Sequence, residues 1–582
     1  MTSLFSKPRA LTSLVSHFKT YRPVTGKLHV ATLTLLLFLA AAAIAVTSSL
    51  WLSKATKEFD RPTLVTTKPV PELEPPHKIE VLVNCTSFLN QNRSASCSRT
   101  SLWLNKTKSY NQPTVITTKP VHGPVPIGPL PEKKSTKKTG ILVDCTSFLN
   151  QNRSGSCSRT AQPGYNNNQT ESNRTCPDYF KWIHEDLKPW RETGITREMV
   201  ERGQTTAHFR LVIVNGKVFV ENYKKSIQTR DAFTLWGILQ LLRKYPGKLP
   251  DVDLMFDCDD RPVIRSDGYS KSNLTAENAP PALFRYGGDR WTADIVFPDW
   301  SFWGWQEINI KPWSKVLKEM EEGKKKKKFM EREAYAYWKG NPFVASPSRE
   351  DLLTCNLSSQ HDWNARIFIQ DWISEGQKGF ENSNVADQCT YRYKIYIEGY
   401  GWSVSEKYIL ACDSVTLMVK PYYYDFFSRI LQPLQHYWPI NDKDKCRSIK
   451  FAVDWLNNHT QKAEEIGREA SKFMQRDLSM ENVYDYMFHL LNEYSKLLKF
   501  KPQVPRNSVE ICTEAKVCPS GDDDGTNKRF LMGSLVDEPH LSSPCSLPPP
   551  FDPNGLEKFH RKKLNLIRQV EKWEHAFWKN VR

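Results

Sequence analysis

The stretch YRYKIYIEGYGWSVSEKYILACDSVTLMV, residues 391–419, decides the fold class of this chain. Tyr391 to Ile397 alternates in polarity as a strand does, Glu398 to Gly401 is a glycine turn, and Val415 to Val419 is a second, apolar strand. Between them Ser403-Val-Ser-Glu406 fits a capping box that would begin a helix. The order strand, glycine turn, helix, strand predicts an α/β fold.

The region around this unit, residues 176–505, is aromatic-rich and alternates strand-like with helix-like patterns. At about 330 residues it is long enough for two α/β domains. Asn215-Gly216 joins two apolar runs and predicts a β-hairpin, and Val252 to Phe256 predicts a buried strand ending in Asp257-Cys-Asp-Asp260. Helices with apolar periodicity follow over 449–500 and are expected to pack on the sheet of the first unit.

A segment without charged residues, 28–52, predicts a membrane span, because its 25 residues would form a helix of about 38 Å. Five basic residues precede it, and positive flanks stay cytoplasmic. We therefore expect a single-pass type II protein with residues 1–27 as a cytoplasmic tail and everything later in the lumen. A cleaved signal peptide is the competing interpretation, but its apolar region would be shorter, at about 7–15 residues. The absence of a Lys-Asp-Glu-Leu-type retention signal favours the Golgi over the ER.

Two features favour an oxidising and glycosylating compartment. All 13 Cys lie beyond the predicted span, and disulfides persist in such a compartment, although an odd count leaves one thiol free or paired with another chain. The nine Asn-x-Ser/Thr sequons also lie beyond it, at Asn84, Asn92, Asn105, Asn152, Asn168, Asn173, Asn273, Asn356 and Asn458.

Residues 53–175 are rich in Pro, Thr and Lys, and we expect an extended, disordered and glycosylated stem. The stem contains a duplication, because 78–100 and 138–160 are identical at 18 of 23 positions. A spacer without chemistry is the favoured interpretation. In each copy two cysteines could close a small loop: Cys85 with Cys97, and Cys145 with Cys157.

The C-terminal region, 506–582, is expected to be a low-complexity tail followed by a basic amphipathic helix over 555–582. The net charge of the chain is +17, and +15 of it falls in residues 1–27, 324–328 and 555–582. So uneven a distribution excludes a nucleic-acid groove that extends over the whole protein.

Two local patterns suggest chemistry. Gly399 to Ser405 would lie at the amino end of a helix, where free N–H groups suit a diphosphate, with an ordinary capped helix as the alternative. Asp257 and Asp259 could hold a divalent ion that bridges a nucleotide-sugar diphosphate. Alternatively, one aspartate of the 257–260 run is a general base that takes a proton from an acceptor hydroxyl, or all are simply solvated carboxylates.

Five ordered motifs between about 176 and 500 resemble the Rumi-type protein O-glucosyltransferases and the related fungal capsule-associated proteins, most closely their plant homologues. The motifs are Tyr179 to Trp190 (YFKWIHEDLKPW), Asp257 to Pro262 (DCDDRP), Phe297 to Trp303 (FPDWSFW), Tyr337 to Arg349 (YWKGNPFVASPSR) and Asp387 to Cys412. The resemblance implies two Rossmann-like domains in the arrangement called GT-B, here 176–335 and 336–505. It also implies an inverting reaction from a UDP-sugar that needs no metal.

The resemblance implies roles for individual residues. Asp260 matches the catalytic base, Asn341 and Arg349 match positions that contact the nucleotide sugar, and Cys389 and Cys412 match a family disulfide. Animal members have an arginine where Ser405 stands, so the neutralising charge must come from elsewhere, with Arg349 and Lys407 as candidates. Animal members also carry a Cys-bracketed acceptor loop, and 223–233 has no Cys. The diphosphate-side loop matches Tyr400, Gly401, Trp402, Ser403, Val404 and Ser405.

The sequence therefore predicts an inverting, Golgi-anchored transferase that moves glucose or xylose from a UDP-sugar to a protein or polysaccharide hydroxyl. The UDP-sugar is a co-substrate, and no metal or other cofactor is expected. Expected partners are the donor, the acceptor and the membrane, without nucleic acid. One alternative is a metal-dependent transferase using Asp257 and Asp259, and another is a non-catalytic lumenal sugar-binding protein.

Overall fold

The structure, a computed structural model, describes residues 174–580 except 270–273, 276, 345–346, 519–525 and 540–542, together with the single residues 143, 145 and 157. These residues belong to one compact unit, Pro129–Arg582. The predicted cytoplasmic tail, the predicted membrane span and most of the predicted stem lie outside the described residues. Within the described part of the chain, no helix combines the length and the apolar character that crossing a membrane requires.

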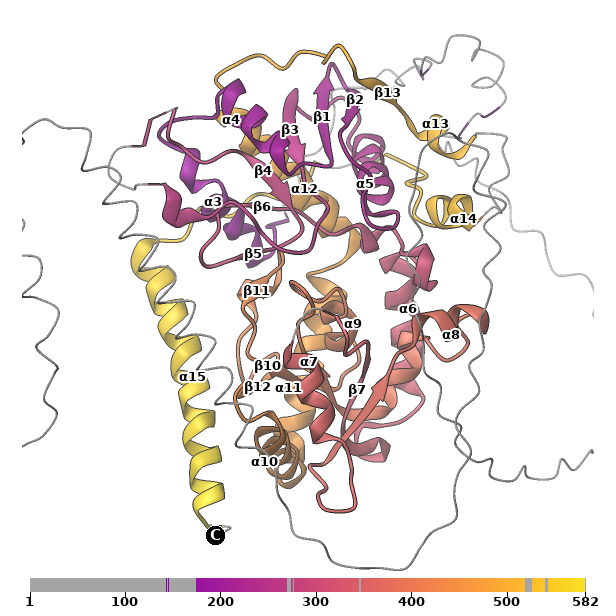
Figure 1. Cartoon of the computed structure of the whole chain (residues 1–582), viewed down its shortest axis with the longest axis vertical. Coiled ribbons are helices and arrows are strands. Elements are labelled where there is room, and N and C mark those ends of the chain that lie inside the picture. The colour runs from indigo at the N-terminus through magenta and orange to yellow at the C-terminus, as the bar shows by residue number, and fades with distance from the viewer. Residues whose placement is uncertain are drawn as a thin grey trace, which may run out of the picture. The chain divides into compact units, whose positions relative to one another are not determined.

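The first of two large sheets has six strands in the order β13-β2-β1-β3-β4-β6 (Figure 1). The predicted hairpin is confirmed: β1 and β2 pair antiparallel, and both Asn215 and Gly216 of the turn have positive φ, at 51° and 73°. Only β3, β4 and β6 run parallel, so this sheet is mixed. The strands are β1 Phe209–Val214, β2 Lys217–Asn222, β3 Val252–Phe256, β4 Leu283–Arg285, β6 Ile295–Val296 and β13 Val509–Ile511.

The second sheet is wholly parallel, with five strands in the order β12-β10-β9-β7-β8. It contains the unit predicted from residues 391–419, because β9 and β10 pair in parallel and the short helix α9 (Glu406–Leu410) connects them. The inner strands β9 and β10 are largely or wholly buried, as expected when helices cover both faces of a parallel sheet, whereas the edge strand β8 ends in two exposed residues. The strands are β7 Glu333–Gly340, β8 Ala365–Ile369, β9 Tyr391–Tyr396, β10 Val415–Val419 and β12 Trp438–Ile440.

The predicted capping box before α9 is wrong. Ser405, not Ser403, is the N-cap residue, and its side chain makes no capping hydrogen bond. The backbone N–H of Ser403 instead donates to the Tyr396 hydroxyl, and its Oγ lies 2.8 Å from Ser405 Oγ. The contacts of the glycine turn with its surroundings therefore override the local capping pattern.

The helices divide between the two sheets. α10 packs against β7, β8, β10 and β12, and α11 packs against β10. The prediction that all of 449–500 packs on the second sheet is wrong for α12, which packs against α3, α5 and β3. The Tyr494 hydroxyl of α12 donates to the backbone oxygen of Asp253 in β3. The longer helices are α5 Arg230–Lys244, α6 Trp313–Lys325, α10 Lys445–Asn458, α11 Thr460–Arg476 and α12 Met480–Leu497, and the shorter ones are α3 Trp182–Asp186, α4 Arg197–Arg202, α7 Pro347–Leu352 and α8 Trp372–Gln377.

A small antiparallel sheet joins the two halves of the protein, the first half being the part built on the six-stranded sheet and the second half the part built on the five-stranded sheet. It pairs β5 (Gly288–Asp289), which follows β4 of the first sheet, with β11 (Tyr423–Tyr424), which follows β10 of the second. Beside it, Arg429 forms a buried ion pair with Asp186. Backbone hydrogen bonds and a buried ion pair thus join the two halves at neighbouring positions.

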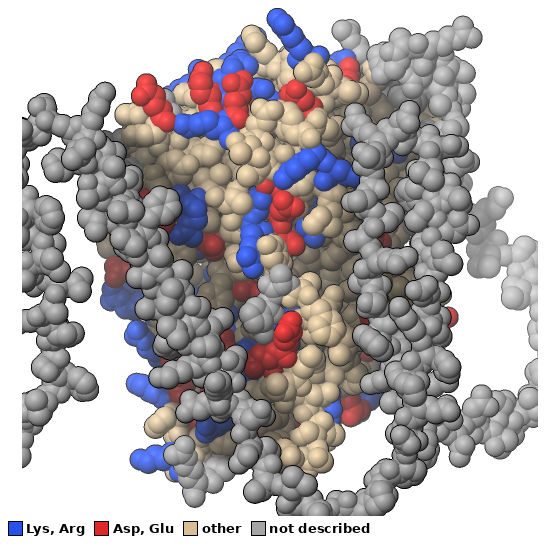
Figure 2. Space-filling view, viewed as in Figure 1, with Lys and Arg blue, Asp and Glu red and all other residues tan. Residues whose placement is uncertain are grey.

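The C-terminal region is structured where it is described, contrary to the expectation of a low-complexity tail. It supplies β13 to the first sheet and continues with α13 (Thr513–Val517), α14 (Thr526–Gly533) and α15 (Pro553–Asn580). The helix predicted over 555–582 is confirmed as α15. Its Trp573 stacks on Trp455 and its Phe577 packs on Phe451, so the apolar face covers α10. Lys and Arg side chains gather along the left edge of Figure 2, where α15 runs in Figure 1.

The predicted loop between Cys145 and Cys157 is wrong. Cys145 pairs with Cys518, and Cys157 pairs with Cys512. A short spacing in the sequence does not reveal partners that lie more than 350 residues away. The other possible loop, Cys85 with Cys97, falls outside the described residues.

Three more disulfides and one thiol complete the described cysteines. Cys389–Cys412, which the family resemblance implies, joins the residues before β9 to the residues after α9. Cys258 is buried and belongs to no disulfide. Five disulfides in one unit fit an oxidising compartment. The remaining two are Cys176–Cys545 and Cys355–Cys446.

Two of the nine predicted glycosylation sites are described, Asn356 and Asn458. Asn458 is exposed at the end of α10. The Asn356 amide instead donates to the backbone oxygen of Ile367 and accepts from the Ile367 N–H. Glycosylation remains a prediction, and Asn458 is the better placed of the two.

We expect non-reducing peptide mapping of the full chain to find peptides that link Cys145 to Cys518 and Cys157 to Cys512. The structure places each pair with Cα atoms 5.2 and 6.0 Å apart, within the normal range for a disulfide. The Cys389–Cys412 peptide serves as an internal control for the method. Recovery of a peptide linking Cys145 to Cys157 would contradict the structure.

Candidate active site

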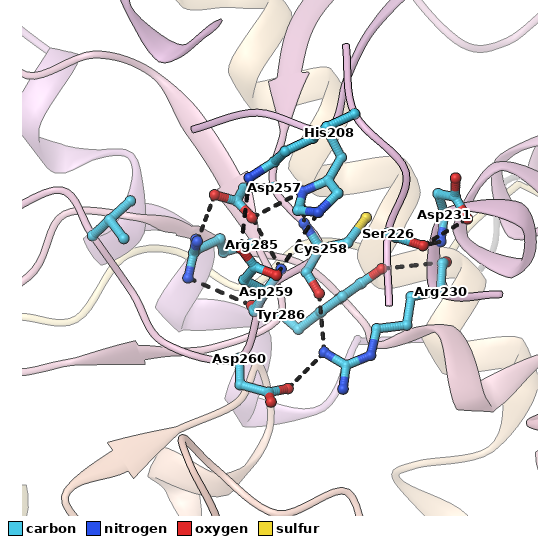
Figure 3. Close-up of polar contacts among 12 residues, drawn as sticks. His208, Ser226, Arg230, Asp231, Asp257, Cys258, Asp259, Asp260, Arg285 and Tyr286 are labelled. Carbon is cyan, nitrogen blue, oxygen red and sulfur yellow. Dashed lines mark hydrogen bonds and ion pairs between the residues drawn. The ribbon is translucent and has the colours of Figure 1, made fainter. Parts of the chain in front are cut away.

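The Asp257–Asp260 run begins directly after β3, so the chain delivers these carboxylates to the carboxyl end of a buried strand. Asp260 Oδ1 accepts a hydrogen bond of 2.7 Å from Arg230, the first residue of α5 (Figure 3). Arg230 also donates to the backbone oxygen of Cys258 and stacks on Trp300 at 4.3 Å. These contacts fix the Asp260 carboxylate, whose side chain is 26% exposed.

The glycine turn of the second sheet lies against Asp260. A Cβ on Gly401 would lie 2.4 Å from the backbone oxygen of Asp260, so no other residue fits without a shift of the backbone. Next to it, Arg261 Nε donates to the backbone oxygen of Tyr400, and its guanidinium stacks on the Tyr400 ring at 3.8 Å. The structure therefore brings the predicted base and the predicted diphosphate turn together from different sheets.

Arg349 hydrogen-bonds to the glycine turn and to the residues that precede it. Its guanidinium donates to the backbone oxygens of Asn341, Ile397 and Glu398 and to Ser403 Oγ, at 2.8–3.1 Å. Arg349 is 9% exposed, and burial lowers the pKa of its guanidinium to about 10. Most of its donors are thus engaged with the protein, and it acts first as a positioning residue for the turn.

The remaining turn residues are mostly buried. Trp402 packs on Tyr286 and Trp300 of the first half, while Val404 and Ser405 are half-buried. Lys407, the other candidate for neutralising a diphosphate, is buried and pairs with Asp299 at 2.9 Å. Its charge is therefore compensated within the protein.

Two arginines were not singled out from the sequence. Arg261 was visible in the DCDDRP motif, and it is the exposed guanidinium at the mouth of the site. Arg230 lies 30 residues before Asp260 in the chain, and no local pattern marks it as its partner. Only the folded structure, in which the start of α5 reaches the loop after β3, reveals that contact.

Three carboxyl groups near the turn have raised pKa values: Glu398, which is half-buried, and Glu406 and Asp425, which are buried. Burial raises the pKa of Glu398 to about 7, although its carboxylate accepts from the N–H groups of Tyr422 and Tyr423. Burial also raises the pKa of Asp425 to about 6 and that of Glu406 well above its usual value. These acids are therefore largely protonated in mildly acidic solution.

Asp257 and Asp259 form a separate polar cluster with His208, whose ring nitrogens lie 3.1 Å from Asp257 and 3.8 Å from Asp259 (Figure 3). The three side chains are close enough to share a metal ion. However, Arg285 forms a buried ion pair with Asp257, and Lys224 lies 3.6 Å from Asp259. Burial alone would raise the pKa of Asp257, but the hydrogen bond from His208 and the charge of Arg285 hold it at about 2. Protein cations thus already compensate these carboxylates.

The profile of glycosyl transferase family 90 matches residues 171–574 of this chain. The chain belongs to this family. The match spans both sheets and most of α15, so it extends through the C-terminal region that the motif resemblance had left out. Membership of family 90 makes the protein a glycosyltransferase.

Curated relatives agree with the resemblance to Rumi-type enzymes, which is confirmed. The chain is 24% identical to human Protein O-glucosyltransferase 1 over 344 residues, 56% of this chain and 82% of the human protein. It is 21% identical to O-glucosyltransferase rumi of Drosophila melanogaster over 341 residues, 56% of this chain and 78% of the fly protein. It is 23% identical to the rumi homolog of Anopheles gambiae over 397 residues, 66% of this chain and 92% of the mosquito protein.

We predict that Gly401→Ala lowers sugar transfer by about 10- to 100-fold, because the new Cβ forces the turn away from Asp260 and displaces the two walls of the site. The matched control is Gly399→Ala, whose Cβ would lie 3.4 Å from the Arg349 guanidinium, an ordinary van der Waals contact that requires no shift. Initial rates and melting temperatures of both variants check the prediction. Equal rates for the two variants would contradict it.

We predict that, between about pH 5 and 7.5, the melting temperature of Glu398→Gln falls less, or rises more, than that of the unchanged chain. The folded-state pKa of Glu398 is raised to about 7, so its contribution to stability is complete below the ordinary pKa of 4.5 and is lost as pH rises through 7. Calorimetry at several pH values measures the effect, with the exposed Glu192→Gln as the control. The same pH dependence in Glu398→Gln and the unchanged chain would refute the assignment.

Proposed function

We propose that this family 90 protein is an inverting transferase that moves glucose from UDP-glucose to a hydroxyl group of a protein, with UDP-xylose as a second donor. The observation that carries the proposal is the position of Asp260, fixed by Arg230 and directly opposite the turn of residues 400–405. The relatives named as protein O-glucosyltransferases support glucose and a protein acceptor.

In the proposed reaction the acceptor hydroxyl binds beside Asp260. One carboxylate oxygen, Oδ1, is held by Arg230, and among the described residues none hydrogen-bonds to Oδ2. Oδ2 takes the hydroxyl proton as the acceptor oxygen forms a bond to the anomeric carbon. The bond from that carbon to UDP breaks on the opposite face, and UDP leaves with the electron pair. A single displacement of this kind inverts the anomeric centre.

The donor is proposed to bind in the GT-B manner, with its diphosphate at the 400–405 turn and its sugar near Asn341. Negative charge that develops on UDP must be stabilised by preorganised donors or cations. Arg261 is available for this role, because it is exposed and stacked on Tyr400. Arg349 contributes by holding the turn in shape.

We also propose that the protein acts in the secretory pathway, as a Golgi type II membrane protein with residues 28–52 as its anchor, and with the ER as the alternative. The disulfides of the described unit support an oxidising lumen. The names of the O-glucosyltransferase relatives do not distinguish the Golgi from the ER.

The alternative mechanism uses a metal ion at Asp257 and Asp259. The cluster with His208 has suitable ligand types, but the ion pair between Asp257 and Arg285 opposes a second positive charge there. We therefore expect EDTA to leave sugar transfer unchanged. The other alternative, a non-catalytic sugar-binding protein, predicts no release of UDP from any UDP-sugar.

We predict that Asp260→Asn lowers transfer by about 10²-fold or more, because the amide cannot accept the hydroxyl proton. UDP-glucose binding and the melting temperature should barely change. The matched control is Asp259→Asn, the neighbouring half-exposed carboxylate, which should retain most activity. UDP formation and transfer by the full chain measure both.

Asp257→Asn tests whether Asp257 has a structural role. It leaves the buried Arg285 without its closest carboxylate and should reduce stability by about 3–5 kcal/mol. If Asp260→Asn keeps near-normal turnover while EDTA or Asp259→Asn abolishes it, the metal mechanism replaces the proposed one.

A further inference from the structure

A pocket of about 540 Å³ lies beside the first sheet of the protein. Four segments distant in sequence form it: β2 with the residues after it, the start of α5, β13 and α13. The lining residues are Val220, Asn222, Tyr223, Lys224, Lys225, Asp231, Ala232, Leu235, Val509, Ile511 and Lys516.

The floor of this pocket is apolar and its wall is cationic. Val220 and Leu235 are buried beneath it, while three lysines, Lys224, Lys225 and Lys516, line it against a single carboxylate, Asp231. Asp231 is already engaged, because its Oδ1 accepts hydrogen bonds from Ser226 Oγ and the N–H of Ala232. The pocket therefore has an excess of positive charge.

Two of the lysines have uncompensated charges. Within the described chain no carboxylate lies within ion-pair distance of Lys225 or Lys516, whereas Lys224 pairs with Asp259. Burial lowers the pKa of the Lys516 ammonium, an effect that the more distant Asp231 only partly opposes. Both ammonium groups are therefore available to incoming carboxylates.

The wall that carries Lys516 is covalently fixed. β13 pairs with β2, and the disulfides Cys157–Cys512 and Cys145–Cys518 hold the two ends of the segment that includes α13. Preorganised cations of this kind lose less entropy on binding than lysines on a free loop.

The pocket lies next to the proposed catalytic base. Lys224 Nζ is 3.6 Å from Asp259, and Asp231 follows Arg230, which pairs with Asp260. In Figure 3 the Ser226–Asp231 contact lies on the far side of Arg230 from Asp260. The pocket and Asp260 thus lie on either side of the Arg230 side chain, so an acceptor must be extended, as a peptide segment is, to reach from one to the other.

We propose that this pocket binds an acidic segment of the protein acceptor, in which a carboxylate side chain meets Lys225 and Lys516 and a neighbouring apolar side chain covers Val220 and Leu235. The proposal rests on the proposed function for its protein acceptor. A peptide is favoured over a glycan because the apolar floor has no counterpart in a hydrophilic sugar acid.

Two labelled peptides test the proposal on the purified full chain: one alternates Glu and Leu, and the other alternates Gln and Leu. Fluorescence anisotropy at low ionic strength should show about tenfold tighter binding of the Glu-Leu peptide, the equivalent of two modest ion pairs. The double variant Lys225→Gln/Lys516→Gln should bind both peptides equally. Lys188→Gln, an exposed lysine outside the pocket, is the control and should keep the preference.

Charge reversal separates recognition from a structural role. The double variant Lys225→Glu/Lys516→Glu should bind a Lys-Leu peptide more tightly than the Glu-Leu peptide. A misfolded pocket would not show this reversed preference. Melting temperatures identify any variant that is unfolded. Equal binding of the Glu-Leu and Gln-Leu peptides by the unchanged chain would overturn the proposal. Tighter binding of trigalacturonic acid than of the Glu-Leu peptide would overturn the peptide assignment in favour of an anionic glycan.

The two proposals fail separately. UDP formation from UDP-glucose tests the transferase function without any acceptor preference. If UDP forms but neither acidic probe binds, the pocket assignment is wrong and the transferase stands. If the Glu-Leu peptide binds but no UDP-sugar is consumed, the proposed function is wrong and the pocket remains a site for acidic peptides.

Discussion

The contact between Gly401 and the backbone of Asp260 sets the distance between the two walls of the candidate site. A turn from the wholly parallel sheet meets a loop from the mixed sheet at a separation that leaves no space for a side chain. Three further contacts join the same two parts of the protein. They are the ion pair between Lys407 and Asp299, the packing of Trp402 on Trp300 and the stacking of Arg261 on Tyr400. Because interiors are close-packed, a change at one of these contacts is transmitted to the others.

The buried charges near the site mainly organise the protein. Arg349 holds the glycine turn, Lys407 is compensated by Asp299, and Arg285 is compensated by Asp257. Each was a plausible ligand group from its residue type alone. A buried ion that already has its partners can be diverted to a ligand only by leaving another charge unpaired, which is costly. The exposed Arg261 carries no such restriction, and Asp260 keeps its contact with Arg230 through Oδ1 while Oδ2 remains available.

The sequence was most informative where local pattern and tertiary structure agree. Residues 391–419 predicted β9, the turn and β10, because 391–397 alternates in polarity as a strand does and 415–419 is the continuous apolar run of a buried parallel strand. Asp260 was found through its motif, and the structure adds the partner that orients it. The pairing of Arg230 with Asp260, the position of α12 on the first sheet and the partners of Cys145 and Cys157 could not be predicted, because each depends on segments far apart in the sequence. The capping box failed because Ser403 is engaged elsewhere: its N–H donates to the Tyr396 hydroxyl and its Oγ accepts from Arg349.

The three disulfides that join residues 145–176 to residues 512–545 impose an order on how the protein matures. Each closes across 355–373 residues, so none can form until nearly the whole polypeptide has emerged from the ribosome. The first sheet is likewise incomplete until β13, the strand at its edge beside β2, has been made. Until then the outer edge of β2 exposes unpaired backbone groups, a known route to aggregation. The first half must therefore be protected during synthesis and completed last, although it is made first.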